Sequence, residues 1–153
     1  MSEHEDVWII TDSKQSAESL VKLEFSDIVD AARELGLEPV LERIAVQIYN
    51  KEMYEKICNV YEFPCFIFTL YEYRNGNIES FPDICRFCIY NDIKFITMWD
   101  YLATSEVMEI AKQYGIKVYV HTVNNKELVE KLGKLGVTGF YTDYITPEEL
   151  KEI

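Results

Sequence analysis

The chain has 153 residues, of which 48% are hydrophobic, and a formal net charge of −12. This size and composition suit one globular domain, which we expect to span residues 1–153. The negative charge disfavours binding to nucleic acid and to anionic membranes. The acidic N-terminus is unlike a signal peptide, and no segment has the roughly 18 apolar residues of a membrane span. We therefore expect a cytoplasmic protein without nucleic-acid partners.

Short apolar runs alternate with amphipathic segments along the chain. The first run, Val7–Thr11, is followed by residues 16–35, whose spaced apolar positions predict a helix that could be split near residues 24–26. Because Val7–Thr11 is largely apolar, it predicts a strand covered on both faces. Further strands are expected at Ile44–Tyr49, Cys65–Tyr71, Phe95–Trp99, Val118–Thr122 and Phe140–Thr142. Further helices are expected at Lys51–Tyr61, Phe81–Asn91, 104–114 and Lys126–Leu135, with a last turn after Thr146.

The expected helix boundaries carry recognisable capping residues. Side chains that can cap a helix N-terminus are Ser16, Asn50, Thr104 or Ser105, and Thr146, the last followed by Pro147. Glycines that can end a helix in the left-handed conformation are Gly36, Gly115 and Gly136, and residues 74–77 read as a turn.

Six strand–helix units in alternation predict a parallel α/β sheet with right-handed crossovers. Two architectures fit this pattern. A doubly wound sheet of five or six strands is complete at this length, whereas an eight-stranded barrel typically needs about 250 residues. Counting alone therefore favours the doubly wound sheet.

Four cysteines occur in the chain, and two of them, Cys85 and Cys88, form a C-x-x-C pair. A zinc site needs a second pair or added histidines, and a redox motif needs an exposed helix start after a strand. Here the pair lies inside an expected helix, on a face shared with Ile84 and Phe87. We therefore expect buried, reduced thiols.

The segment 118–143 carries a family resemblance. Val118-Tyr119-Val120-His121-Thr122-Val123-Asn124 is similar to the V-x-V-W-T-V-N pattern on the seventh barrel strand of the glycerophosphodiester phosphodiesterase family. Gly136-Val137-Thr138-Gly139-Phe140-Tyr141-Thr142-Asp143 is similar to the family's G-V-D-G-I-I-T-D at its eighth strand. The family is a barrel within the wider superfamily that includes the phosphatidylinositol-specific phospholipases C.

A third motif, Ile10-Thr11-Asp12-Ser13-Lys14, resembles the acidic-x-Lys motif that ends the family's third strand. By this resemblance Asp12 is a ligand of a divalent cation, Ca²⁺ or Mg²⁺, and Lys14 contacts the substrate phosphate. The resemblance implies an α/β fold of the (β/α) TIM-barrel type. The six units would be strands three to eight, so the first two units would be missing and the domain would be partial.

The family's catalytic motif, His-Arg-Gly with a Glu-x-Asp metal pair and a second histidine, does not occur in this sequence. The two histidines are His4, in the acidic leader, and His121, which stands where the family usually has tryptophan. Loss of a general acid and a general base removes factors of roughly 10²–10⁴ each. We therefore assign no catalytic residue and expect weak or absent hydrolysis of glycerol phosphodiesters by this chain alone.

Polar and aromatic residues at the expected strand ends are candidates for substrate binding, because ligands of α/β folds gather at the carboxyl ends of strands. They are Gln47, Tyr49, Trp99 and Asn124. Ordinary packing remains an alternative for the first three, and a helix cap remains one for Asn124.

Two functions remain open. The first is a small-molecule phosphodiesterase of the family, and the alternative is a non-catalytic α/β binding or interaction module with a doubly wound sheet. A partial barrel leaves open strand edges, which proteins normally cover. We therefore expect a homo-oligomer or a complementing chain at those edges.

Overall fold

The computed structural model describes residues 7–13, 18–71, 73 and 80–150. The chain divides into two compact units, residues 1–67 and residues 68–153. The expected cap Ser16 and the expected turn at residues 74–77 lie outside the described residues.

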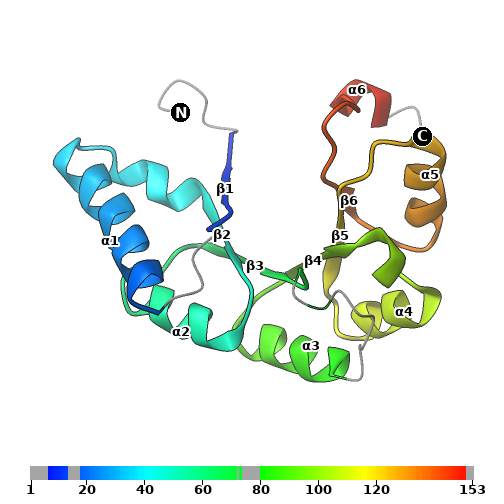
Figure 1. Ribbon diagram of the computed structural model, residues 1–153, viewed down its shortest axis with the longest axis horizontal. Helices are drawn as coiled ribbons and strands as arrows, with labels where there is room; N and C mark the ends of the chain where they lie inside the picture. Colours follow the sequence, from blue (N-terminus) through cyan, green and yellow to red (C-terminus); the bar gives the residue numbers. More distant parts are fainter. Residues whose placement is uncertain (1–6, 14–17, 72, 74–79, 151–153) are drawn as a thin grey trace. The chain divides into compact units, whose positions relative to one another are not determined.

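The first unit contains two paired parallel strands and the helices that accompany them (Figure 1). Its elements are β1 (Ile9–Thr11), α1 (Glu18–Glu34), the 3₁₀ helix η1 (Glu38–Arg43), β2 (Ile44–Ile48), α2 (Lys51–Cys58) and the start of β3 (Cys65–Thr69). In the pairing of β1 with β2, Ile9 lies opposite Ile44 and Thr11 opposite Val46. The two helices α1 and α2 contact one another.

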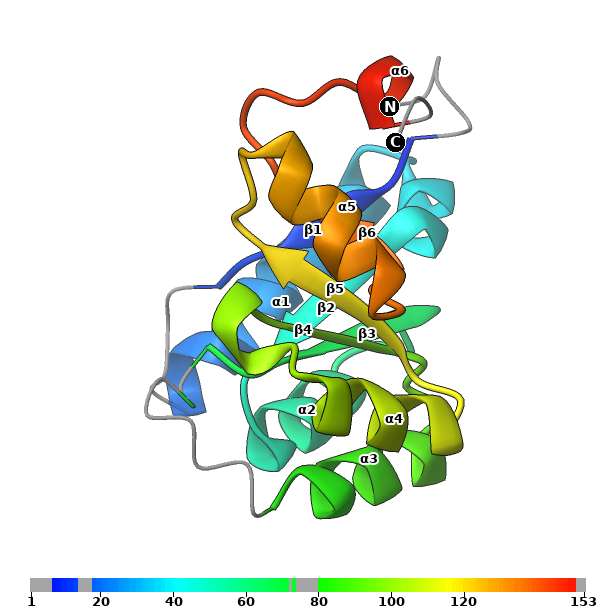
Figure 2. The same cartoon turned by 90° about the vertical axis from the view of Figure 1, so that its right-hand side faces the viewer.

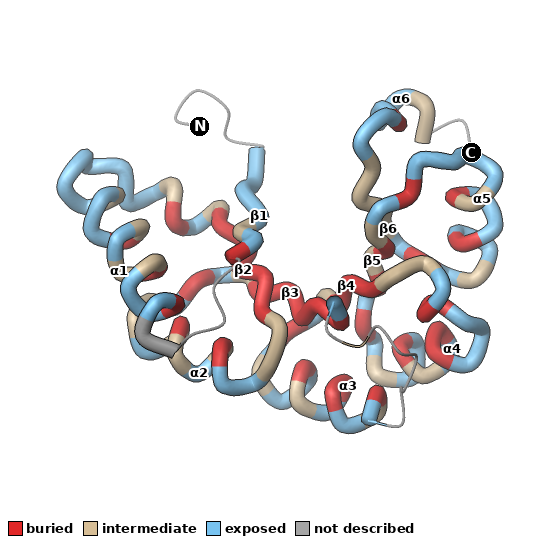
Figure 3. Tube along the Cα trace, viewed as in Figure 1, coloured by how far each residue is buried: buried red, intermediate tan, exposed pale blue. Residues whose placement is uncertain are grey.

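The core of the first unit lies between its helices and β2, which is buried along its whole length (Figure 3). Val21, Phe25 and Val29 recur every four residues along one side of α1, which is the spacing of a buried helical stripe. The Phe25 ring meets the Phe63 ring edge-on at 5.7 Å. Helix α1 is continuous, so the break expected near residues 24–26 is absent from it.

Strand β1 differs from the expectation of a strand covered on both faces. Val7, Trp8, Ile9 and Ile10 are each 40–50% exposed. The physical reason is position, because β1 is the end strand of the sheet order and pairs with β2. The apolar composition of β1 therefore does not mean that the strand is buried within this chain.

The second unit continues the alternation of strands and helices (Figures 1 and 2). Its elements after the end of β3 are α3 (Phe81–Tyr90), β4 (Phe95–Trp99), the 3₁₀ helix η2 (Asp100–Leu102), α4 (Ser105–Gln113), β5 (Lys117–His121), α5 (Lys126–Lys134), β6 (Gly139–Phe140) and α6 (Pro147–Leu150). Helices α3 and α4 lie side by side in both views and contact one another. Strands β4, β5 and β6 pair in parallel.

The two faces of this second sheet segment differ in composition. Ile96 and Met98 of β4, together with Val118 and Val120 of β5, are fully buried. Residues alternate between the faces of a strand, so the neighbouring ring-bearing residues share the opposite face. These are Phe95, Trp99, Tyr119 and His121, all half-buried.

The six strands follow one another in chain order, from β1 to β6. A doubly wound sheet reverses its strand order at a switch point, whereas a (β/α) barrel adds each strand beside the one before it. The observed order is the barrel's, and the prediction of a TIM-barrel-like α/β fold with six βα units is confirmed. Counting residues favoured the doubly wound sheet, which is the wrong architecture, because the length of a chain carries no information about the order of its strands.

Several local predictions are confirmed. Asn50 caps α2 by accepting a hydrogen bond from the Met53 amide at 2.8 Å, and Thr104 caps α4. Gly36, Gly115 and Gly136 all have positive φ angles, as expected for residues that end helices. The strand β4 has its expected bounds, whereas most other elements end one to three residues early, and η1 and η2 were not predicted.

Among the described residues, we find no helix with the length and apolar character needed to cross a bilayer.

Candidate functional site

The carboxylate of Asp12, which follows β1, is held by two side chains of the neighbouring strand end. Its Oδ1 atom accepts a hydrogen bond from the Tyr49 hydroxyl and one from the Gln47 amide nitrogen at 3.4 Å. Parallel pairing of β1 with β2 brings these strand ends together. Asp12 itself is exposed, so the two donors orient a carboxylate that solutes can reach.

Gln47 and Tyr49, both predicted to bind substrate, therefore contact Asp12 in this structure. Gln47 is buried at 9% exposure, and its backbone amide also donates to the Thr11 hydroxyl at 3.3 Å. Tyr49 directly precedes Asn50, the N-cap of α2. The prediction that both residues bind substrate stays a prediction.

The predicted cation site is incomplete in the part of the chain that the structure describes. No group of three or more His, Cys, Asp or Glu side chains that could hold a metal ion lies in residues 7–13, 18–71, 73 and 80–150. Divalent cations of this class take six or more oxygen ligands, and Asp12 supplies one carboxylate. The donor set described does not fit a bound cation, and we derive no step through one. Lys14, the predicted phosphate contact, lies outside the described residues.

In the second unit, Trp99 ends β4 beside His121, which ends β5. Their ring centroids are 4.7 Å apart, and Tyr71 lies 5.3 Å from Trp99 and 6.1 Å from His121. Tyr141, just after β6, lies 6.3 Å from His121. Trp99, which was predicted to bind substrate, is therefore part of a group of rings at the strand ends.

Asn124 joins the end of β5 to the loop after β6. Its amide nitrogen donates to the Asp143 carboxylate at 2.9 Å, and its amide oxygen accepts from the Asp143 backbone and the Thr142 hydroxyl at 2.9 and 3.0 Å. The cap of α5 is the next residue, Asn125, which accepts from the Leu128 amide at 3.0 Å. The alternative that Asn124 is the helix cap is therefore wrong, and the prediction that it binds substrate stays a prediction.

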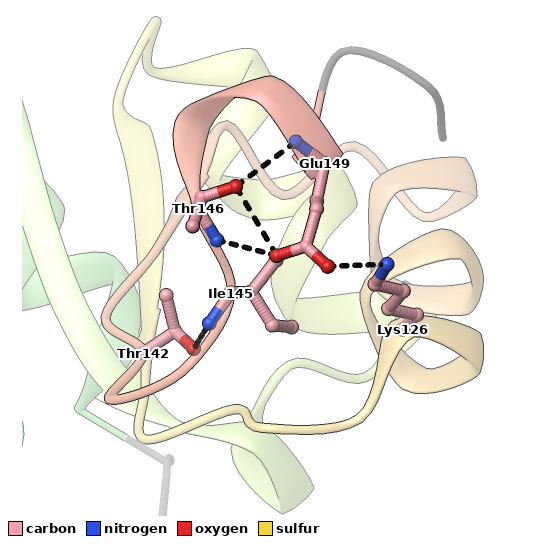
Figure 4. Close-up of polar contacts among 5 residues, drawn as sticks. All are labelled: Lys126, Thr142, Ile145, Thr146 and Glu149. Carbon is pink, nitrogen blue, oxygen red and sulfur yellow. Dashed lines mark hydrogen bonds and ion pairs between the residues drawn. The ribbon is translucent and has the colours of Figure 1, made fainter.

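The loop after β6 is closed by a capping box at α6 (Figure 4). The Thr146 hydroxyl accepts from the Glu149 amide at 3.3 Å, and the Glu149 carboxylate accepts from the Thr146 amide at 2.9 Å. Glu149 also pairs with Lys126 of α5 at 2.8 Å. The Lys126 ammonium, followed by the Thr146 hydrogen bonds, lowers the pKa of Glu149 to about 2.

The C-x-x-C pair is structural. Cys85 and Cys88 are buried on α3 and form no disulfide, as expected from their helical spacing. Burial raises the pKa of the Cys85 thiol to about 11, so the nucleophilic thiolate is scarce at neutral pH.

Comparison with the sequence models of known families gives a match to part of the chain. Residues 83–146 match the sequence model of the glycerophosphoryl diester phosphodiesterase family. The matched segment is 64 of the 153 residues, and it is similar to this family. The matched range contains β4, β5 and β6, with the strand ends at Trp99, His121 and Asn124, so the resemblance read from the sequence is confirmed there. A search of curated proteins finds no match.

Solved structures assigned as glycerophosphodiester phosphodiesterases share the fold. The chain matches one from Silicibacter pomeroyi with a TM-score of 0.65 at 17% identity, covering 95% of this chain and 48% of that one. It matches one from Agrobacterium tumefaciens with a TM-score of 0.59 at 16% identity, covering 82% and 49%. It matches one from Galdieria sulphuraria with a TM-score of 0.70 at 16% identity, covering 99% and 58%. The chain thus spans about half the length of these phosphodiesterase structures.

Two features of the candidate site were not recognised from the sequence. The first is the hydrogen bonding of Asp12, which depends on the register of β1 against β2. The second is the grouping of rings around Trp99 and His121. Alternating aromatic residues in β4 and β5 were a usable signal for it, because positions two apart share a face.

Proposed function

We propose that this chain is a glycerophosphodiester phosphodiesterase-like domain whose ligand class is a small glycerol phosphodiester. The observation that carries the proposal is the family match over residues 83–146 on strands arranged in barrel order. In such folds the carboxyl ends of the strands form the ligand site. Asp12 and Trp99 stand at such ends, each within its own unit.

The chain's own residues support binding better than turnover. His121 is the one histidine in the described part of the chain, and it packs among rings, whereas His4 lies outside that part. A phosphodiesterase of this type needs an acid and a base in addition to charge stabilisation. Hydrolysis by the isolated chain is therefore weak or absent.

Binding and turnover are tested separately. Titration of ¹⁵N-labelled protein with glycerophosphoglycerol, followed by NMR, should shift the amide signals of Asp12 and Tyr49 with millimolar affinity. Asp12→Asn keeps the shape of the side chain and removes its charge, and Glu55→Gln on the exposed side of α2 is a matched charge control. Unchanged spectra up to high millimolar ligand would refute the proposed ligand class.

Turnover is followed by ³¹P NMR of the same diester, with and without added Ca²⁺ or Mg²⁺. Phosphodiester hydrolysis at an ordinary enzymatic rate, roughly 1–10³ s⁻¹, would contradict the inference of a weak or inactive chain. A single positioned carboxylate also predicts no saturable binding of either cation at micromolar concentration, and calorimetry of wild type and Asp12→Asn checks this.

A non-catalytic binding module remains the second candidate. It is favoured by the packing of His121 among rings and by the incomplete cation donors among the described residues. This candidate predicts no turnover under any cation condition and no cation affinity at Asp12.

Association through β1 also follows from its exposure. Ile9 and Ile10 of the end strand and Trp8 just before it are 40–50% exposed, and exposed end strands pair readily with another chain. The proposed occupant is the same strand of a second copy. Sedimentation equilibrium should show a dimer that Ile9→Lys weakens, while Leu35→Lys, at an equally apolar exposed site on the first unit, should not. A monomer at high concentration would rule out this contact.

A further inference from the structure

A groove lies between α5, β6 and α6, which are neighbours in the second unit (Figures 1 and 2). Its volume is about 410 Å³, which is within the usual range for small-molecule sites. A Cβ atom at Gly139 would point at the Tyr119 ring, and because neighbours along a strand alternate, Phe140 points to the opposite face of β6. The groove therefore lies on the side of β6 that α5 covers, and all of its lining residues are described.

Apolar side chains line much of the groove. Val129 of α5 is 3% exposed, while Phe140 of β6 and Leu150 of α6 are half-buried. Gly133 lies one helical turn after Val129, and a Cβ atom there would meet nothing within 4 Å. Glycine is an unfavourable residue inside a helix, and here it leaves space that a side chain would fill. The groove thus offers unfilled volume and apolar surface to a ligand.

An ion pair lies at the exposed edge of the groove. The Lys134 ammonium donates to the Glu130 carboxylate at 2.5 Å, one turn apart on α5. The hydrogen bond from Lys134, followed by its charge, lowers the pKa of Glu130, so both groups are charged at neutral pH. The two side chains are 73% and 52% exposed, and surface pairs of this kind are weak enough to exchange for pairs with a ligand. The groove edge therefore presents one ammonium and one carboxylate side by side.

We propose that this groove binds a free α-amino acid with a large apolar side chain, such as leucine or phenylalanine. The ligand's carboxylate pairs with Lys134, its ammonium pairs with Glu130, and its side chain lies against the apolar lining. A ligand with only one of these charges would be attracted by one group and repelled by the other, so the ion pair favours a zwitterion. The groove lies beside the start of β6, away from the carboxyl ends of the strands, and the inference does not rest on the proposed function.

A series of ligands tests the chemistry. L-Phenylalanine should shift the amide signals of Gly133, Thr138 and Phe140 in a saturable manner in NMR spectra of ¹⁵N-labelled protein. Glycine should bind roughly 10-fold more weakly, because it has the same charges without an apolar side chain. Phenethylamine lacks the carboxylate and 3-phenylpropionate lacks the ammonium, so each should bind roughly 2- to 5-fold more weakly. Phenylalanine affinity equal to that of glycine, or to that of either single-charge analogue, would overturn the proposal.

Two substitutions at Gly133 locate the binding. Gly133→Leu fills the groove from α5 and should abolish phenylalanine binding, whereas Gly133→Ala adds one methyl group and should weaken binding less. Both should be at least as stable as the wild type in urea, because leucine and alanine are better helix formers than glycine. A loss of binding therefore reports the filled groove and not unfolding. Phenylalanine affinity that is unchanged in Gly133→Leu would overturn the assignment to this groove.

Two lysine variants test the charge contact. Lys134→Gln should weaken binding of phenylalanine and of 3-phenylpropionate roughly 2- to 5-fold, without weakening phenethylamine. Lys131→Gln is the matched control, because Lys131 is an exposed lysine of the same helix that does not line the groove. Equal effects of the two variants on phenylalanine would overturn the pairing with Lys134. The proposed function fails separately, since its test uses a diester and a substitution at Asp12.

Discussion

Replacing Gly139 with alanine places a methyl group against the ring of Tyr119. The two residues lie opposite one another in β6 and β5. A Cβ atom at Gly139 would lie 2.3, 2.6 and 2.9 Å from Cε1, Cδ1 and Cζ of that ring, whereas ordinary contacts begin at 3.4 Å. The ring must therefore move by about 1.1 Å, the difference between 3.4 and 2.3 Å. Glycine at this position makes room for the ring to cross the strand.

The displacement is costly because Tyr119 has other ring neighbours. Phe95 lies 5.9 Å and Tyr141 lies 6.4 Å from it between centroids. Inserting a methyl group into packed surroundings typically destabilises a protein by about 1–3 kcal/mol. Alanine also loses less chain entropy than glycine on folding, which offsets about 0.5–1 kcal/mol. We expect Gly139→Ala to lower the free energy of unfolding by up to about 2.5 kcal/mol.

Urea unfolding followed by circular dichroism measures this change. Gly133→Ala is the matched control, because a Cβ there meets nothing within 4 Å and the residue lies in α5. It should stabilise the protein by up to about 1 kcal/mol. In a Tyr119→Ala background the penalty of Gly139→Ala should disappear, since the clashing ring is gone. A penalty of equal size in both backgrounds, or stabilisation by Gly139→Ala in the wild type, would refute the steric explanation.

Three further predictions concern the second unit. Asn124→Asp replaces the side-chain donor to Asp143 with a second carboxylate. It should destabilise the chain by about 1–3 kcal/mol at neutral pH, and by less in acid, as measured by urea unfolding. Asn125→Asp is the control, because aspartate caps α5 equally well. The pKa of Glu149 is lowered from 4.5 to about 2, so its stabilisation is present above pH 4.5 and is lost as the pH falls towards 2. The difference in thermal midpoint between wild type and Glu149→Gln should therefore shrink over that range, and a constant difference would contradict the pairing with Lys126 and Thr146. Cys85, whose pKa is raised to about 11 by burial, should resist iodoacetamide at pH 8 until the chain unfolds, as followed by peptide mass spectrometry, and rapid native labelling would contradict its burial.

The sequence alone predicted features that depend on neighbours along the chain. Asn50 and Thr104 cap their helices, and Gly36, Gly115 and Gly136 end theirs, because a cap or a left-handed glycine acts within a few residues. The capping box between Thr146 and Glu149 has the same local origin. The six strand–helix units were recognisable for this reason, and the motif in residues 118–143 indicated the same family whose sequence model matches residues 83–146.

Only the tertiary structure decided how these elements meet. The barrel order of the strands depends on pairing between residues that are 20–35 apart in sequence. The exposure of β1 and the hydrogen bonds from Tyr49 and Gln47 to Asp12 likewise depend on residues 35–37 apart. Asn124 was expected either to bind substrate or to cap a helix, and the structure shows instead of a cap that its side chain is hydrogen-bonded to Thr142 and Asp143. The secondary-structure propensity of a segment does not determine the register of its strand, and the register sets the partners of every side chain on a sheet face. Strand register likewise brought the rings around Trp99 together at the strand ends.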